Sequence, residues 1–278
     1  MHIHMHTHIH MHTTEEGTMP GKIIAICNWK GGCGKTSVSI ALANGLNRMG
    51  KKALLIDLDP QCNATDTYRG SYKGVTTLYD VLVDGVDAKE AVQHLEAGDL
   101  IACDPLLRKA EASMSSVGKE NILRKALRDL KKEYDFIILD CPPQTGILQN
   151  NAMVAADSCI IPISPDRYTV IGLAALNENI RDVRENTMNE NLSIEGLLMV
   201  RVNDQRILSK EIMDMLPEVS RMLDTKCFES TIREAEAVRR SQSEKMTIFE
   251  WEEAVKRKLP VAEDFRAFIR ELLDEEGK

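Results

Sequence analysis

A glycine-rich segment near the start of the chain carries residue types that bind phosphate. Residues 30–37 read KGGCGKTS. In such a loop, glycines let backbone N–H groups face the phosphates at a helix N-terminus, a lysine reaches the β- and γ-oxygens, and a hydroxyl holds Mg²⁺. Gly34, Lys35 and Thr36 occupy these three places. The segment therefore predicts a phosphate-binding loop that takes ATP or ADP together with Mg²⁺.

The start of this loop departs from the ordinary phosphate-loop pattern, G-x-x-x-x-G-K-S/T. That pattern places a glycine at position 29, where this chain has Trp29, and the next residue is a second lysine, Lys30. A lone lysine is usually a solvated surface charge, but a position inside a glycine loop favours a role in phosphate binding. We expect Lys30 and Lys35 to act in catalysis. We expect the nucleotide to contact the following loop residues: Gly31, Gly32, Cys33, Gly34, Lys35, Thr36 and Ser37.

Acidic residues follow two apolar runs further along the chain. Asp57 and Asp59 end the run that starts at residue 53, and Asp140 ends FIILD (136–140). In open α/β sheets, ligand-binding groups lie at the carboxyl ends of the strands. An isolated acid after a strand is more often a helix cap or a loop charge, so position alone does not assign a role to these three residues.

The elements that would position these residues alternate along the chain between short apolar runs and longer amphipathic stretches. Apolar runs suit strands that are buried on both faces, so the pattern predicts an α/β fold with a doubly wound, mostly parallel sheet and helices on both faces. Strands are expected at 23–27, 53–58, 136–140, 159–163 and 196–200. Helices are expected near 36–49, 119–132, 147–156, 170–185, 209–223 and 260–274. A more polar insertion at 66–118 contains TTLYDVLVDG and DAKEAVQHL, which we expect to form two short helices.

Composition narrows the class of protein. Six of the seven histidines stand at every second position from His2 to His12, so residues 1–18 are expected to be an expression tag or a disordered extension. Residues 19–278 are expected to form a single P-loop ATPase domain. The seven cysteines form no C-x-x-C pair, and no apolar run approaches the roughly 20 residues of a spanning helix. Both features favour a protein of the reducing cytoplasm with no membrane partner.

The segments around the acidic residues complete a family pattern. IDLDPQCNAT (56–65) and YDFIILDCPPQTG (134–146), together with the two-lysine loop, resemble the deviant Walker A ATPases of the ParA/MinD superfamily. The resemblance implies that Lys30 crosses the interface of a nucleotide-sandwiched dimer to the partner's phosphates. In such a sparse site, lysines and Mg²⁺ neutralise phosphate charge and a carboxylate only orients water, which predicts slow hydrolysis that partners accelerate.

The same resemblance implies a role for each remaining residue of the site. Asp59 would position the attacking water and is the expected catalytic carboxylate. Asp57 would lie near the phosphates as a nucleotide-binding residue. Asp140 would bind Mg²⁺ through water beside Thr36, and Pro142 would belong to a turn that senses the γ-phosphate.

Two further segments, 155–176 and 208–216, are similar to ParA-type partition ATPases in particular. This resemblance implies a homodimer in the ATP state, binding of sequence-nonspecific DNA, and hydrolysis stimulated by a ParB-like centromere-binding or adaptor protein. The expected outcome is segregation or positioning of a plasmid, a chromosome or another cargo. The expected location is the cytoplasm, on the nucleoid.

A basic surface for DNA is expected toward the C-terminus. The net charge of −8 argues against a constitutively basic protein but leaves a local basic face open. The alternative is a set of solvated helix charges interleaved with glutamates. Many relatives carry Pro-Arg-Asn where this chain reads IREA (232–235), so the contacts to the base stay open. The candidate DNA-binding residues, whose phosphate contacts would double in a dimer, are Arg206, Lys210, Arg233, Arg239 and Arg240.

Three other functions are open to the same fold. A MinD-like membrane-associated positioning ATPase would end in a basic amphipathic helix, whereas FRAFIRELLDEEGK (265–278) suits a helix docked on the core. A nitrogenase-reductase-like electron carrier would need cysteines at its dimer interface, and Cys103, Cys141 and Cys159 do not form such a pair. A regulator that binds nucleotide without hydrolysis is disfavoured, because the expected catalytic residues are all retained.

Overall fold

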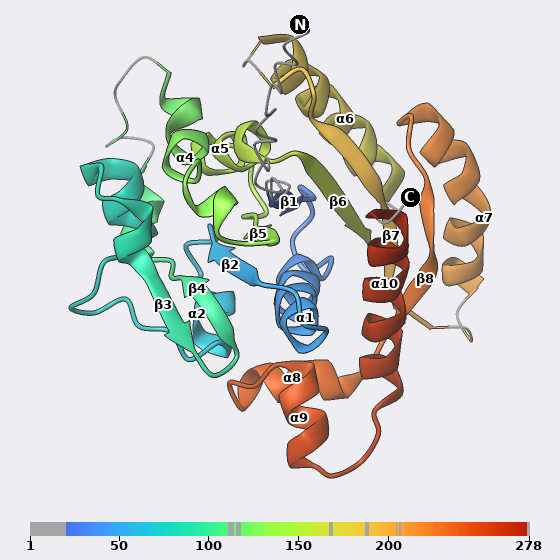
Figure 1. The fold of residues 1–278 in the computed structure, drawn as a ribbon. Coiled ribbons are helices and arrows are strands. Elements are labelled where there is room, and N and C mark those ends of the chain that lie inside the picture. The colour runs from blue at the N-terminus through green and yellow to red at the C-terminus, as the bar shows by residue number, and fades with distance from the viewer. Residues whose placement is uncertain are drawn as a thin grey trace, which may run out of the picture.

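Eight strands form one sheet at the centre of the protein (Figure 1). The computed structural model describes residues 21–110, 114, 118–166, 169–186, 189–203, 205 and 207–276, so the expected tag at 1–18 lies outside the described residues. In this part of the chain the strand order is β3-β4-β2-β5-β1-β6-β7-β8, and every neighbouring pair is parallel except β3 and β4. The strands are β1 (Lys22–Ile26), β2 (Ala53–Asp57), β3 (Val92–Leu95), β4 (Gly98–Ile101), β5 (Phe136–Asp140), β6 (Ser158–Ile163), β7 (Ser193–Val202) and β8 (Cys227–Arg233).

Helices cover both faces of this sheet, which confirms the predicted doubly wound α/β fold. The described α-helices are α1 (Lys35–Arg48), α2 (Asn63–Thr67), α4 (Ile122–Ala126), α5 (Ile147–Ala155), α6 (Thr169–Asn186), α7 (Ile207–Met222), α8 (Glu236–Ser243), α9 (Ile248–Ala254) and α10 (Pro260–Glu276). Shorter helical turns are η1 (Asp80–Asp84), η2 (Ala88–Ala91), η3 (Pro105–Lys109), η4 (Lys119–Asn121) and η5 (Leu130–Lys132).

The apolar strand runs supply two separate hydrophobic cores, because successive side chains of a strand point to opposite faces. In β1, Ile24 and Ile26 pack in a core with residues of α1 and α10. Ile23 and Ala25 pack in the other core, with residues of α4, α5, α6 and α7. Burial on both faces explains why these runs read as continuous apolar sequence rather than as an alternating pattern.

Helix α1 holds the phosphate loop at its N-terminus. The apolar residues of this helix from Val38 to Leu46 are buried. Gly50 has a φ of +81° and follows the end of the helix, a place that favours glycine. At Gly45, an added Cβ would lie 2.3 Å from Ile269 Cδ1, so glycine allows α10 to pack directly on α1.

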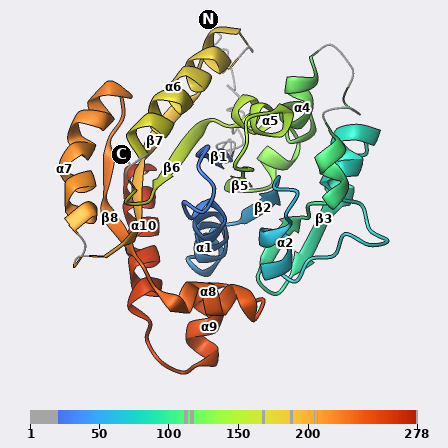
Figure 2. The same ribbon diagram turned by 180° about the vertical axis from the view of Figure 1, so that it is seen from behind.

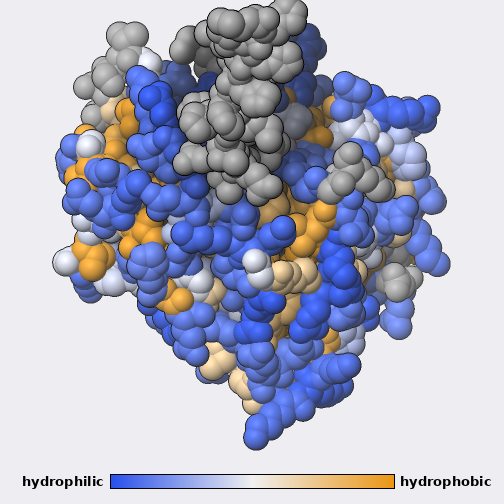
Figure 3. Space-filling model, in the orientation of Figure 1, coloured by the Kyte–Doolittle hydropathy of each residue, from blue (hydrophilic) through white to orange (hydrophobic). Residues whose placement is uncertain are grey.

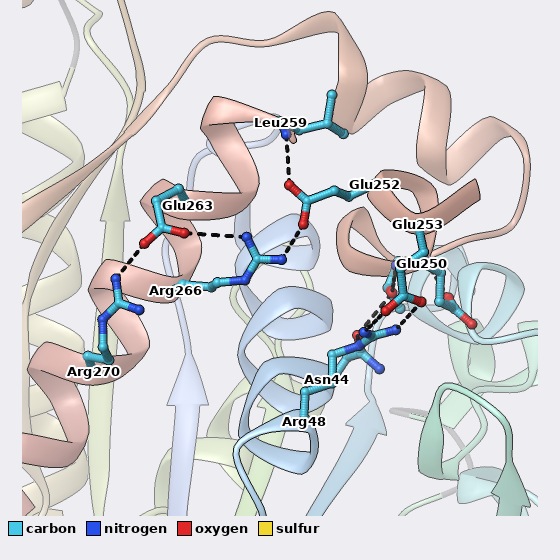
Figure 4. A network of polar contacts seen from close by, with 10 residues as sticks. Asn44, Arg48, Glu250, Glu252, Glu253, Leu259, Glu263, Arg266 and Arg270 are labelled. Carbon is cyan, nitrogen blue, oxygen red and sulfur yellow. Dashed lines mark hydrogen bonds and ion pairs between the residues drawn. The ribbon is translucent and has the colours of Figure 1, made fainter. Parts of the chain in front are cut away.

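Charged side chains join α1, α9 and α10 at the surface (Figure 4). Arg48 on α1 donates from Nη1 to Glu253 on α9 over 2.5 Å. Arg266 on α10 pairs with Glu252, and its guanidinium carbon lies 5.1 Å from the centre of the Phe249 ring. Ion pairs at the surface contribute little to the free energy of unfolding. Their main effect here is to link α9 to α1 and α10.

The final helix is docked on the core, as the sequence predicts. Four apolar side chains on one face of α10 are buried: Phe265, Phe268, Ile269 and Leu272. The rings of Phe268 and Phe228 meet edge to face with centroids 5.0 Å apart, which joins α10 to β8. From behind, β7 and β8 lie between α10 on one side and α7 on the other (Figure 2).

The structure contains three strands that were not predicted, and two of the expected helices differ from those observed. The five expected strands are present, but β3, β4 and β8 were not predicted, because Gly, Asp, Gln and His dilute the apolar signal in β3 and β4 and Glu and Ser dilute it in β8. The expected helix over DAKEAVQHL is wrong in its second half, where VQHL forms edge strand β3. The expected helix at 119–132 is broken into η4, α4 and η5. Leu123, Leu127 and Leu130 of this segment are nevertheless buried.

The surface seen in the view of Figure 1 is mainly hydrophilic, and the hydrophobic residues that show there form separate areas (Figure 3). Among the described residues, no helix combines the length and the apolar character needed to cross a bilayer.

Candidate nucleotide-binding site

A cleft of about 580 Å³ opens where β1, β2, β7 and β8 end. This is the edge at which a doubly wound sheet holds its ligands, and the volume suits a small-molecule site. One wall is the loop between β1 and α1, and the opposite wall comes from the ends of β7 and β8 and from α8. The loop residues that line it are Gly32, Gly34, Lys35, Thr36, Ser37 and Val38. Gly31 and Cys33, which were also expected to contact nucleotide, do not line this cleft.

Two glycines give the loop its shape. Gly32 and Gly34 have φ values of +73° and +91°, in the region that favours glycine. A Cβ on Gly34 would lie 3.2 Å from Val200 Cγ2, so the loop also packs tightly on the end of β7. Gly34 caps α1 without a side-chain hydrogen bond, which leaves the first-turn N–H groups of the helix for an anion.

Lys35 is buried inside the loop that it serves. Its Nζ donates to the carbonyl of Lys30 over 3.0 Å, and Cys33 Sγ donates to the same oxygen over 3.1 Å. Burial raises the pKa of the Cys33 thiol, which keeps the proton that this hydrogen bond requires. The loop is thus closed on itself through one carbonyl oxygen.

Lys30 does not line this cleft and contacts a different part of the chain. Its Nζ lies 2.8 Å from Asp166 Oδ2, just after β6, and 31% of the side chain is exposed. The backbone N–H of Lys30 donates to Asn28 Oδ1, and Asn28 Nδ2 donates to the carbonyl of Pro162 in β6. Buried Asn28 therefore fixes the start of the loop against the neighbouring strand.

Asp140 lies beneath the loop and keeps one oxygen unsatisfied. Oδ1 accepts from Ser39 Oγ over 2.9 Å, and the hydroxyl of Thr36 lies nearby. Oδ2 is buried and has no hydrogen-bond partner. Burial raises the pKa of Asp140, and the nearby carboxylate of Asp57 raises it further. A buried acid pair with an unused oxygen lacks a cation, which is the environment that Mg²⁺ would satisfy.

The side chains of the described residues could hold Mg²⁺ only together with the phosphates of a bound nucleotide. No group of three or more His, Cys, Asp or Glu side chains in the described ranges is arranged to hold a metal alone. Mg²⁺ commonly takes one or two protein ligands and fills its shell with phosphate oxygens and water. Thr36 and Asp140 are therefore the side chains that would hold it, as the sequence predicted.

Asp57 and Asp59 lie close in sequence but occupy different environments. Asp57 is fully buried: Oδ2 accepts from the N–H and the hydroxyl of Thr65, and Oδ1 accepts from the N–H of Asp59. Asp57 does not line the cleft, and its hydrogen bonds hold the loop after β2. Asp59 does line the cleft, as expected for a residue that reaches the γ-phosphate.

A second cleft of about 360 Å³ adjoins Asp59 on the far side of the proline turn. Pro142 lines this second cleft only, whereas Pro143 lines both clefts. Gln61, Arg108 and Gln144 also face it. The turn that contains Pro142 therefore lies between the two clefts, and Pro143 is its residue on the side of the larger cleft.

The four candidate DNA-binding residues that the structure describes lie on three different elements, β8, α8 and α7. Arg233 and Arg239 line the nucleotide cleft, and Arg233 makes a two-pronged hydrogen bond with Asp264 at 2.6 and 2.7 Å. Arg240 donates to Glu236 one turn earlier on α8. Lys210 is exposed on α7, and Arg206 lies outside the described residues.

Four residues of this region were missed by sequence reasoning. They are Ser39, Asp166, Arg201 and Glu234. Ser39 lies one helical turn after Lys35, so its helix position gave a signal that could have been used. The others meet the loop only through the packing of β6, β7 and β8, and no local spacing marks them.

Comparisons with known proteins agree with this geometry. The family model described as an AAA domain matches residues 21–194, more than half of the chain. The sporulation initiation inhibitor protein Soj of Bacillus subtilis is 37% identical over 216 residues, which cover 76% of this chain and 84% of Soj. The chromosome partitioning protein ParA of Myxococcus xanthus is 36% identical over 198 residues, 70% of each chain.

Solved structures share the fold over nearly the whole chain. A cobyrinic acid a,c-diamide synthase of Mycobacterium smegmatis, with bound ATP analog and magnesium, has a TM-score of 0.78 at 25% identity and covers 93% of this chain and 97% of its own. A putative plasmid partition protein of Borrelia burgdorferi B31, bound to AMPPNP, has a TM-score of 0.76 at 25% identity and covers 92% and 99%. The chain therefore belongs to the ParA/Soj family of partition ATPases, within the deviant Walker A class of P-loop ATPases.

Proposed function

We propose that this chain is an ATP-dependent partition ATPase that dimerises around ATP, holds nonspecific DNA as the dimer, and releases it after slow hydrolysis. A ParB-like centromere-binding or adaptor protein would stimulate hydrolysis, and the cargo would be moved over the nucleoid in the cytoplasm. The observation that carries this proposal is the placement of the two loop lysines. Lys35 is buried inside its own loop, whereas Lys30 is partly exposed beside it.

ATP would bind with its phosphates on the loop at the N-terminus of α1. The free N–H groups of the first turn and Lys35 supply donors and positive charge there. The base would extend toward the ends of β7 and β8, where the cleft is lined by Val200, Ile232 and Ala235. Bound Mg²⁺ would neutralise charge on the transferring phosphoryl group. Thr36 and Asp140 would hold it, and the unused oxygen Asp140 Oδ2 is placed for this.

Hydrolysis would depend on Asp59. Its carboxylate is tied at Oδ1 to the N–H of Gln61 over 3.0 Å, and the buried side chain of Asp57 holds the N–H of Asp59. These bonds orient the carboxylate toward the cleft, where it can accept a proton from a water molecule in line with the γ-phosphate. A carboxylate that only orients water is a weak catalyst, which suits an enzyme whose rate is set by a partner.

Dimerisation would use Lys30. Because Lys35 already serves the phosphates of its own subunit, a second lysine on the same loop is redundant in a monomer. Its exposed side chain can instead reach the phosphates of a facing subunit, as the family resemblance implies. Two clefts facing each other would then enclose both nucleotides, and each subunit would complete the other's site.

The experiment that tests the proposal measures DNA binding in each nucleotide state. Fluorescence anisotropy of labelled duplexes of unrelated sequence is recorded with ADP, with ATP and with a slowly hydrolysed ATP analogue. Wild type should bind duplexes only with ATP or the analogue, and with similar affinity for each sequence. DNA binding of equal affinity in all nucleotide states, or no DNA binding in any state, would contradict the proposed role in partition.

Two variants and a matched control separate the steps. Lys30→Ala should bind ATP but form no dimer in sizing chromatography and hold no DNA. Asp59→Ala should form a dimer that persists, because ATP stays unhydrolysed, and should hold DNA longer than wild type. Lys51→Ala removes an exposed lysine just beyond α1 and should behave as wild type in each assay.

A further inference from the structure

Arg201, near the end of β7, sits at an irregularity of the sheet. In the pairing of β7 with β8, Val200 is opposite Ile232 and Val202 is opposite Arg233, so Arg201 is an extra residue with no partner. Its φ is +57°, which non-glycine residues rarely adopt. A bulge of this kind is uncommon between parallel strands and is often found beside a functional site, where it changes the direction of a side chain.

The bulge directs Arg201 onto the phosphate loop. Its Nη1 donates to the carbonyl of Gly32 over 2.7 Å. Its Nη2 lies 3.8 Å from Glu234 Oε1, on the segment that follows β8. All three residues line the nucleotide cleft. Arg201 therefore links the phosphate loop to the opposite wall of the cleft, although the loop and β7 are far apart in the sequence.

The bond to Gly32 has a consequence on the other side of the same peptide group. A trans peptide group is planar, so its C=O and its N–H point in opposite directions. The carbonyl of Gly32 shares its peptide group with the N–H of Cys33. When Arg201 holds this carbonyl on one side, it turns the N–H of Cys33 to the other side of the loop. Without this bond, Gly32 is free to rotate the group, because glycine has few conformational restrictions.

We infer that Arg201 is a positioning residue for the phosphate loop: through the Gly32 carbonyl it fixes the orientation of the Gly32–Cys33 peptide group and prepares the loop for the phosphates of ATP and ADP. The inference rests on the proposed nucleotide site but adds a residue outside the loop motif.

The test uses variants that keep the bulge. Arg201→Gly removes the side chain and tolerates a positive φ, so the backbone is not forced to move. Arg201→Met keeps an unbranched stem without a donor, and Arg201→Lys keeps a charged donor. Lys256→Gly is the matched control, because Lys256 also has a positive φ, of +50°, but does not line the cleft. Affinities for ATP and ADP are measured by calorimetry, and hydrogen exchange of a peptide covering 30–37 is measured in the nucleotide-free protein.

Arg201→Gly and Arg201→Met should weaken the binding of ATP and of ADP by the same factor, about fivefold to tenfold, as the loss of one solvent-exposed hydrogen bond predicts. Hydrogen exchange in residues 30–37 should become faster in both variants. Arg201→Lys should keep most of the wild-type affinity and most of the wild-type protection from exchange. Unchanged affinity in both variants overturns the inference. So does a loss confined to ATP with unchanged exchange, since that pattern indicates direct attraction to the γ-phosphate. If wild type itself binds no nucleotide, the proposed function fails, and the exchange data still decide whether Arg201 orders the loop.

Discussion

Lys30 Nζ and Asp166 Oδ2 lie 2.8 Å apart in the single chain, so the lysine expected to reach a partner subunit is paired within its own. Both side chains are partly exposed, at 31% and 38%. An ion pair at this level of exposure is worth about 0.2–1 kcal/mol. It is strong enough to bias the direction of Lys30 and weak enough to be replaced by the phosphates of a facing nucleotide. The pair therefore competes with the proposed dimer contact.

Asp166→Asn should favour the ATP-bound dimer. The amide keeps the size of the side chain but removes the charge that holds Lys30. We expect the ATP concentration at half-maximal dimer to fall by about twofold to fivefold, in line with an exposed ion pair. Sizing chromatography across an ATP series measures this. The double variant with Lys30→Ala is the control, because the effect of Asp166→Asn should vanish when Lys30 is absent. An equal effect in both backgrounds would show that Asp166 acts by another route.

Thr65→Val should slow hydrolysis more than it weakens ATP binding. Thr65 Oγ1 donates to Asp57 Oδ2 over 2.8 Å and accepts from the N–H of Cys103 over 3.0 Å. Valine keeps the shape but leaves both buried groups without this partner, at a cost of about 1–3 kcal/mol of unfolding free energy. Asp59 would lose its fixed orientation through Asp57, so kcat should fall about threefold to tenfold with little change in Kd. Phosphate release and ATP calorimetry measure the two quantities.

The control for this prediction is Thr225→Val, at a part-buried site outside both clefts. Thr225 Oγ1 donates to the carbonyl of Ile194 over 2.8 Å. This variant should lose stability without a change in kcat. If Thr65→Val shifts Kd as much as kcat, the loop after β2 supports nucleotide binding rather than the orientation of Asp59.

The accuracy of prediction from the sequence depends on how local each signal is. Short runs of the sequence are enough to predict the phosphate loop, the acids at the ends of β2 and β5, and the five central strands. The structure has the loop and these strands where they were expected. Arg201 could not be predicted, because its direction depends on a register shift between β7 and β8. Arg233 and Arg239 were grouped by their charge and by the family resemblance, and only the fold shows that they line the cleft. The spacing of charged residues along the sequence does not show which of them share a surface, because that depends on how the helices and strands pack together.

Asp140→Asn should remove the effect of Mg²⁺ on ATP affinity. The unused oxygen Asp140 Oδ2 is the proposed outer contact to the metal, and loss of an outer-shell carboxylate weakens metal binding by about 10- to 100-fold. ATP affinity is measured with Mg²⁺ and with a chelator. Wild type should bind ATP more tightly with Mg²⁺, whereas the variant should bind equally in both. Ser39→Ala removes one hydrogen bond but keeps the carboxylate, so it should retain the response to Mg²⁺. A variant that keeps the full response would move the metal site away from β5.

Lys210 and Arg239 should separate DNA binding from ATP binding. Arg239 lines the nucleotide cleft, so Arg239→Ala should weaken ATP binding and lower DNA binding only as a consequence. Lys210 is exposed on α7 and makes no ion pair with the described residues. Lys210→Ala should leave ATP affinity unchanged and weaken DNA binding equally for all sequences, with the slope of log affinity against log salt smaller by about one per lost phosphate contact. Anisotropy at several salt concentrations, with ATP saturating, measures this slope. Each contact to a DNA phosphate releases counterions, so the loss of one contact must reduce the slope. A Lys210→Ala variant with an unchanged slope would therefore show that DNA binds to a face other than α7.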